Sequence, residues 1–354
     1  MRVLLLPFYS QQDKRTGLFL LGSDSGVRAY SYMGRRMLEE GWSPTLAVPR
    51  PKQCSDCQYL PYPTVSIGYD LCTDNLRRRL QWVPDWLAGL DYDLVLTTHE
   101  FLPYPLKCLR PDLRVIVECG IRPDTAWPTT SGMFPLAYGA ADAVHCNSRV
   151  LAGEAVRWAR RVFVWPFGYE DRRGSAVDRD VDVLFPARAS ATGYSNHRLL
   201  AEALDGSSLR VVCTDPTSYL RANPGEVPAE WVSSEQLSRT MYNELLDRSK
   251  VVVGLTANGY GGYAFQEAVA AGCVPVALRC PEYEELLGPS WPYYCDADPY
   301  SLFDAASTAV LYGWPEGLQG PVQACVAQHS YAAAWLRAKL DIEEVCSGLR
   351  TDRS

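Results

Sequence analysis

Long apolar runs are the first thing that this sequence of 354 residues lacks. No segment approaches the ~18 uninterrupted apolar residues of a membrane-spanning helix, so we expect no membrane insertion. The opening segment, MRVLLLPFYS, is too short in its apolar part and too soon followed by charge to be a signal peptide. We therefore expect a cytoplasmic protein.

Patterns typical of metal sites are scarce as well. Cys54-Ser-Asp-Cys57 is the single CxxC motif, and it has no second pair and no nearby histidine. The other cysteines are scattered singly, which favours reduced, mostly buried thiols in a chain with no secretion signal. No Asp-x-Asp pair follows a predicted strand in a way that suggests a metal-held diphosphate. We expect no obligatory metal, with a divalent ion kept as the alternative.

Composition is that of an ordinary globular protein, with 47% hydrophobic and 21% charged residues. The length allows two α/β domains, each with its own core. The net charge of −7 is uneven. Residues 1–170 carry 19 lysines and arginines against 17 aspartates and glutamates, whereas the remainder carries 15 against 24. The two parts of the chain are therefore electrostatically different.

Short apolar runs alternate with segments of helical periodicity along the whole chain. Residues 25–40 show a helical pattern that ends at Gly41, and residues 76–90 show another. Residues 50–63 have no periodicity and predict a loop. Predicted strands cover residues 2–7, 45–48, 93–97, 113–118, 143–146, 162–165, 181–185, 209–213, 251–255 and 274–278. Strands spaced by helices in this way indicate βα units and doubly wound parallel sheets.

Residues 167–180 interrupt the pattern with glycine and charge, as domain seams do. We therefore predict an N-terminal Rossmann-like domain over residues 1–168 and a second over residues 180–320. Residues 321–354 form a predicted helical tail. Such sheets bind ligands at the carboxyl ends of their strands, so two facing domains would define one cleft.

The stretch from residue 251 to 287 is the most informative. An apolar strand leads into a glycine-rich turn at residues 258–262, then a helix that carries Glu267, then a second buried strand. Glycines before a helix N-terminus let backbone N–H groups approach phosphate, and a carboxylate in the helix could accept both hydroxyls of a ribose. The alternative is a structural turn followed by a solvated Glu267.

This stretch resembles the donor-binding signature of GT-B glycosyltransferases, through Gly261-Gly262, Glu267 and Ala271-Gly-Cys-Val-Pro-Val276. The resemblance implies an α/β protein with two facing Rossmann-like domains and a cleft between them. It also implies a nucleotide-sugar donor, with a UDP-sugar favoured, and Tyr263 among the donor-binding residues. One departure is Gly259, where many retaining members have a second glutamate.

Other glycines and cations fit the same resemblance. Gly22 and Gly26 lie between the first strand and the first helix, where GT-B enzymes place a loop beside the donor phosphates. Arg188, His197 and Arg198 cluster around a strand end and a helix start, where cations could neutralise a leaving diphosphate. A helix entry capped by Ser25 and ordinary surface cations are the structural alternatives.

Three residues are candidates for a general base that removes the proton of the acceptor hydroxyl. His99, Glu118 and Asp124 all follow or end predicted strands of the first domain. The alternatives are a hydrogen bond at the edge of the core for His99 and a salt bridge with Arg122 for Asp124.

A second resemblance, to the phage DNA β-glucosyltransferases, favours Glu118. It rests on Glu118-Cys-Gly-Ile-Arg122 followed by Trp127-Pro128, on Asp182-Val-Leu-Phe185 with Arg188 beyond it, and on Glu267 and Val269. In that family an acidic base stands nine residues before the Trp-Pro pair, where this chain has Glu118. The resemblance implies a phage-encoded enzyme that modifies DNA.

The predicted acceptor is accordingly a hydroxymethylated pyrimidine in duplex DNA, with a glycan or a small metabolite as the rival. Clustered arginines at residues 77–79 could follow a phosphate backbone. Aromatic side chains could receive a base turned out of the helix, and these are Tyr104, Trp127, Phe134 and Tyr138. The sequence pI of about 5.3 argues against a DNA partner. We expect a monomer.

Two alternative functions that involve no sugar transfer are also compatible with the sequence. One is a sugar-nucleotide epimerase of GT-B type, which would need no acceptor groove. The other is a binding protein of the periplasmic kind, against which the missing signal peptide argues.

Overall fold

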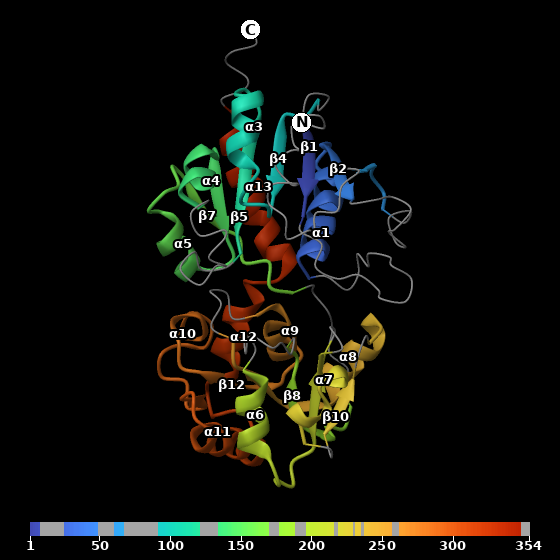
Figure 1. The fold of residues 1–354 in the computed structure, drawn as a ribbon, viewed down its shortest axis with the longest axis vertical. Helices are drawn as coiled ribbons and strands as arrows, with labels where there is room; N and C mark the ends of the chain where they lie inside the picture. The colour runs from blue at the N-terminus through green and yellow to red at the C-terminus, as the bar shows by residue number, and fades with distance from the viewer. Residues whose placement is uncertain are drawn as a thin grey trace. The chain divides into compact units, whose positions relative to one another are not determined.

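The chain forms two α/β units, each built around its own parallel sheet (Figure 1). Unit 1 comprises Met1–Phe167 with Tyr331–Ser354, and unit 2 comprises Gly168–Ser330. The computed structural model describes residues 1–7, 25–48, 60–66, 91–120, 134–169, 177–187, 196–215, 219–228, 231–234, 237–256 and 262–347. Each unit encloses its own hydrophobic core, so the prediction of two parallel α/β domains is confirmed.

The sheet of unit 1 has seven parallel strands in the order β3-β2-β1-β4-β5-β6-β7. The strands are β1 (Arg2–Leu6), β2 (Ser43–Val48), β3 (Thr64–Ser66), β4 (Leu94–Thr97), β5 (Arg114–Cys119), β6 (Ala143–Cys146) and β7 (Val162–Val164). The central strands are buried along their length, which explains their unbroken apolar runs.

The sheet of unit 2 has six parallel strands in the order β10-β9-β8-β11-β12-β13. They are β8 (Val181–Phe185), β9 (Val211–Thr214), β10 (Val232–Ser234), β11 (Ser249–Gly254), β12 (Val274–Leu278) and β13 (Tyr294–Cys295). The strand order reverses beside β1 in unit 1 and beside β8 in unit 2. In open α/β sheets, ligands bind at the carboxyl ends of strands at such points.

Helices connect the strands in both units. Unit 1 contains α1 (Ser25–Glu39), α3 (Pro103–Leu109), α4 (Phe134–Ala140), α5 (Arg149–Ala155) and α13 (Tyr331–Ser347). Unit 2 contains α6 (His197–Leu204), α7 (Tyr219–Ala222), a 3-10 turn (Pro224–Glu226), α8 (Arg239–Arg248), α9 (Tyr263–Ala270), α10 (Pro281–Leu287), α11 (Pro299–Tyr312) and α12 (Gln319–Ala327).

Helix α1 matches the predicted helix over residues 25–40 closely. Tyr30, Met33 and Met37 are buried in the core of unit 1, as the apolar spacing requires. Gly41 has a φ of +76°, so the helix ends in a left-handed residue that only glycine adopts without strain.

The C-terminal helix departs from the predicted division of the chain. Residues 321–354 were expected to form a separate tail, whereas α13 belongs to unit 1 and is drawn in red among its blue and green elements (Figure 1). The physical reason is burial, because Trp335 and Ile342 lie in the core of unit 1. The Trp335 ring packs edge-on against Trp42 with a centroid distance of 5.9 Å.

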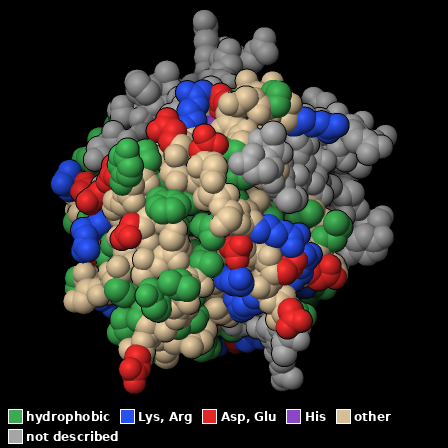
Figure 2. All heavy atoms as spheres, turned by 90° about the horizontal axis from the view of Figure 1, so that it is seen from below, with side chains coloured by type: hydrophobic (Ala, Val, Ile, Leu, Met, Phe, Trp, Pro, Cys, Tyr) green, Lys and Arg blue, Asp and Glu red, His purple; other side chains and the backbone are tan. Residues whose placement is uncertain are grey.

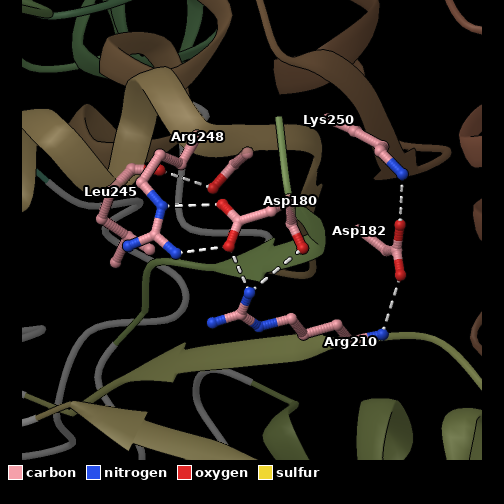
Figure 3. A network of polar contacts seen from close by, with 7 residues as sticks. Asp180, Asp182, Arg210, Leu245, Arg248 and Lys250 are labelled. Carbon is pink, nitrogen blue, oxygen red and sulfur yellow. Dashed lines mark hydrogen bonds and ion pairs between the residues drawn. The ribbon is translucent and has the colours of Figure 1, made fainter. Parts of the chain in front are cut away.

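Charged side chains join the starts of three strands in unit 2 (Figure 3). Asp180, just before β8, pairs with Arg210 before β9 and accepts a hydrogen bond of 2.7 Å from Nε of Arg248. Asp182 accepts one of 2.7 Å from Nζ of Lys250 in β11. The hydrogen bond from Arg248, followed by the pairing with Arg210, holds the pKa of Asp180 well below its usual range.

This network predicts an acid-sensitive contribution to stability. A carboxylate with a depressed folded-state pKa stabilises the fold above its unfolded-state pKa of about 4, and that contribution is lost as the pH falls. We expect Asp180→Asn to lower the denaturant midpoint at pH 7, with a smaller loss at pH 3. The exposed Asp205→Asn, which lies outside the network, serves as the control, and an equal loss at both pH values would refute the linkage.

Candidate functional site

In unit 1 the carboxyl ends of β4 and β5 carry two of the predicted bases. His99 lies just beyond β4, almost completely buried, and its backbone N–H donates to Oγ1 of Thr97 over 3.0 Å. Its ring packs edge-on against Phe101. This environment matches the alternative of a histidine held at the edge of the core, and a role of His99 as base stays a prediction.

Glu118 lies at the end of β5, with its side chain 10% exposed. Nδ2 of Asn147 donates a hydrogen bond of 2.8 Å to its Oε1. Nε2 of His145 lies 3.6 Å from its Oε2. Burial, and then the charge of Glu118, raise the pKa of the Tyr30 hydroxyl on α1. We call Glu118, His145, Asn147 and Tyr30 the Glu118 cluster.

The strand register explains how this cluster forms. β5 and β6 run parallel with Glu118 opposite His145, so both side chains project from the same face of the sheet. Asn147 follows two residues after His145 and therefore returns to that face. A carboxylate with polar neighbours at a strand end can accept a proton from a ligand, which is the geometry of a general base.

In unit 2 the segment that resembles the donor-binding signature follows β11. Gly262 precedes α9 with a φ of +71°, a conformation that favours glycine over residues with side chains. Tyr263 is the first residue of α9. Glu267 lies in the middle of this helix and is only 3% exposed, so the alternative of a solvated helix residue is wrong.

Glu267 is paired with a residue that the sequence analysis missed. Nη2 of Arg239, the first residue of α8, lies 2.9 Å from Oε1 of Glu267. The Arg239 side chain is 31% exposed, and its guanidinium also lies over the ring of Tyr242. A buried carboxylate needs a partner of opposite charge, and Arg239 supplies it. No sequence pattern connects two residues 28 positions apart on different helices.

His197 and Arg198, at the start of α6, converge on one acid. Nε2 of His197 lies 2.7 Å from Oε2 of Glu226, and Nη2 of Arg198 lies 2.5 Å from its Oε1. Hydrogen bonds from Arg198, His197 and Tyr219 lower the pKa of Glu226 to about 2. Both predicted phosphate ligands therefore have an acidic partner, and a phosphate there would compete with Glu226.

The start of α6 is nevertheless tied to the end of β11. Asn196 adopts a left-handed conformation with a φ of 53°, and its Nδ2 donates a hydrogen bond of 2.7 Å to the carbonyl of Leu255. This bond brings the α6 N-terminus beside the carboxyl end of β11, at the point where the strand order of unit 2 reverses.

Several predicted site residues lie outside the described part of the chain. These are Gly22, Asp124, Arg188 and Gly261. Gly26 lies in the first turn of α1. Their roles stay predictions.

Among the described residues, no group of three or more histidine, cysteine or acidic side chains is placed to hold a metal ion. No helix in the same part of the chain has the length and the apolar character that crossing a membrane requires.

A separate pocket of about 360 Å³ lies at the opposite edge of the unit 1 sheet from Glu118. Arg114 at the start of β5, Asp142 before β6 and Glu344 of α13 line it. Asp142 is already paired with Lys107 over 2.9 Å and with Arg114 over 3.2 Å. We assign this pocket no part in the candidate site.

Comparison with known proteins identifies the fold. No family model matches the chain, and no curated protein matches it. Sucrose-phosphate synthase from Thermosynechococcus elongatus is a solved structure that matches with 13% identity and a TM-score of 0.77, over 98% of this chain and 100% of that one. The glycosyltransferase AviGT4 of avilamycin A biosynthesis matches with 13% identity and a TM-score of 0.68, over 98% of each chain.

Anabaena HepE, solved in complex with UDP and glucose, matches with 11% identity and a TM-score of 0.66, over 97% of this chain and 100% of that one. At these identities the likeness shows the fold. The chain therefore has the GT-B fold of glycosyltransferases, as the sequence resemblance implied.

The Arg239–Glu267 pair can be tested by stability. Removing one partner of a fully buried pair costs ~3–5 kcal/mol, and the partial exposure of Arg239 reduces this to about 1–3 kcal/mol for Arg239→Met. We expect the double variant Arg239→Met/Glu267→Gln to recover part of the lost unfolding free energy, because the second change removes the unpaired buried charge. Equilibrium unfolding in urea measures the unfolding free energies of the single and double variants. Losses that add strictly would rule out coupling between the two residues.

Proposed function

We propose that the protein is a glycosyltransferase that moves a sugar from a nucleotide-sugar donor to an acceptor hydroxyl. The observation that supports the proposal most directly is the burial of the Glu267 carboxylate. This carboxylate lies in the helix after β11, with its charge compensated by Arg239, in a chain of GT-B fold. A buried charge in a helix that follows the carboxyl end of a strand is costly to keep, and a role in binding the hydroxyls of a ribose would explain why it is retained.

The proposed donor is a UDP-sugar. HepE was solved with UDP and glucose, and a plant enzyme that also matches this chain was solved with UDP-L-rhamnose. In our proposal the ribose binds at Glu267 of unit 2, and the diphosphate lies over Gly261, Gly262 and Tyr263 of the same unit. Gly22 and Gly26 are the proposed donor-binding glycines of unit 1. Arg188 is the proposed diphosphate cation. His197 and Arg198 are the secondary candidates, and each would have to exchange its contact with Glu226 for the diphosphate.

Glu118 is the proposed general base. As the acceptor oxygen attacks the anomeric carbon, the bond from that carbon to the diphosphate breaks and Glu118 takes the hydroxyl proton. His99 and Asp124 are the reserve candidates. In this proposal, cationic side chains rather than a metal ion neutralise the departing diphosphate.

The described structure argues against the predicted acceptor, a hydroxymethylated pyrimidine in duplex DNA. Phe134 and Tyr138 are buried in unit 1, so these two rings cannot receive a base, whereas Tyr104 is exposed. Figure 2 shows one face of the molecule, seen from below relative to Figure 1, on which positive and negative side chains are mixed. A DNA acceptor also gains no support from the structures that match. We therefore propose a glycan or small metabolite as acceptor and keep hydroxymethylated DNA as the second candidate.

The transfer assay uses labelled UDP-sugars with sugars, metabolites, hydroxymethylated duplex DNA and water as acceptors. We expect wild-type protein to transfer label. In Glu118→Gln we expect turnover to fall ~10²–10⁴-fold while donor binding stays intact. Glu154→Gln on α5 is the control on the same unit. Near-normal turnover in Glu118→Gln with loss in His99→Ala would reassign the base. Interconversion of the donor sugar without transfer would identify an epimerase.

The role of metal is tested in the same assay. We expect transfer to survive an excess of EDTA, because the proposed diphosphate ligands are cationic side chains. Complete loss in EDTA, with recovery on adding Mg²⁺ or Mn²⁺, would show that a metal holds the diphosphate.

A further inference from the structure

His145 is the nearest titratable neighbour of Glu118 across the sheet. The two residues are in register on β6 and β5, and Nε2 of His145 lies 3.6 Å from Oε2 of Glu118. Asn147 holds the other carboxylate oxygen at 2.8 Å. The imidazole edge and the amide therefore approach the two oxygens of Glu118 separately.

The imidazole of His145 is clamped in place. It stacks on the indole of Trp165 with a centroid distance of 4.6 Å and an interplanar angle of 16°. Trp165 is itself fixed, because its Nε1–H donates a hydrogen bond of 2.6 Å to Oδ2 of Asp341 in α13. The stack leaves the ring edge directed at Glu118 with little freedom to turn away.

Burial keeps this ring neutral. His145 is 2% exposed, and burial lowers its pKa to about 3, so it carries no charge near neutral pH. Its contact with Glu118 is therefore an interaction between a dipole and a charge. Neither ring nitrogen has a hydrogen-bond partner among the described residues. Burying a polar group without a hydrogen-bond partner is unfavourable, so the presence of His145 beside a carboxylate calls for an explanation.

We propose that His145 is a positioning residue for Glu118, which it holds ionised and oriented by directing Nε2–H at Oε2. This inference rests on the proposed function of Glu118 as base. Burial of Glu118 favours its protonated form, and a protonated carboxyl cannot accept a proton. A neutral N–H dipole opposes that effect without introducing a cation that would quench the base.

Among the described residues, other titratable groups lie around the pair, and none of them adds a positive charge beside Glu118. Tyr30 of α1 keeps its proton, since burial and the charge of Glu118 raise its pKa. On the neighbouring strands, the hydrogen bond between Cys119 and Cys146 lowers the pKa of the first thiol and raises that of the second. Asp341 is separated from Glu118 by Trp165 and His145.

The tautomer of His145 tests the inference without any assay of activity. The chain has four histidines, so nitrogen-15 spectra of histidine-labelled protein are simple to assign through the signal lost in His145→Phe. We expect a neutral ring protonated at Nε2 from pH 5 to 8. A ring protonated at Nδ1, or an imidazolium at pH 7, would overturn the proposal.

The pH profile provides the second test. Phe in place of His145 keeps a flat ring against Trp165 but removes the N–H group. We expect the acid limb of the turnover profile to move up by about one unit, with turnover restored at higher pH and KM for the donor unchanged. His145→Gln, which offers an amide N–H, should recover part of the shift.

An acid limb that stays in place or moves down in His145→Phe would overturn the proposal, even if turnover falls. A purely structural role would lower turnover equally at all pH values. If wild-type protein acts on no nucleotide sugar, the proposed function fails, and the tautomer measurement still decides whether His145 directs Nε2–H at Glu118.

Discussion

Parallel pairing of buried strands is the constraint on which the rest of this structure depends. Each connection must cross over the sheet, so all carboxyl ends in a unit gather at one edge. Glu118 and His145 meet because β5 and β6 obey this rule, and α9 begins beyond β11 for the same reason. The amino ends gather at the opposite edge, where Asp180, Arg210 and Arg248 join the strands of unit 2 (Figure 3).

The two central carboxylates are stabilised in different ways. Glu267 is paired with the cation Arg239, whereas the neighbours Asn147 and His145 of Glu118 are neutral. A cation beside a carboxylate favours binding and suppresses its basicity, while neutral dipoles hold it charged and leave it able to accept a proton. The difference is consistent with the proposed donor-binding role of Glu267 and the proposed proton-accepting role of Glu118.

Sequence reasoning captured the elements with strong local signals and missed those defined by distant contacts. The buried strand Val251–Gly254 within β11 and helix α1 followed from apolar runs, periodicity and a terminal glycine. β3, β10 and β13 have two or three residues each, too few to show a pattern. The docking of α13 on unit 1 and the Arg239–Glu267 pair depend on tertiary packing, which periodicity does not encode.

Binding of UDP is the measurement that tests the central claim most directly. Calorimetric titration of wild-type protein with UDP should show one site, and Glu267→Gln should weaken it by about 10- to 100-fold, the value of a lost hydrogen bond to a charged group. The exposed Glu202→Gln on α6 should bind as wild type does. Equal affinity in Glu267→Gln and wild type, with both proteins folded, would contradict the assignment of Glu267 to the donor site.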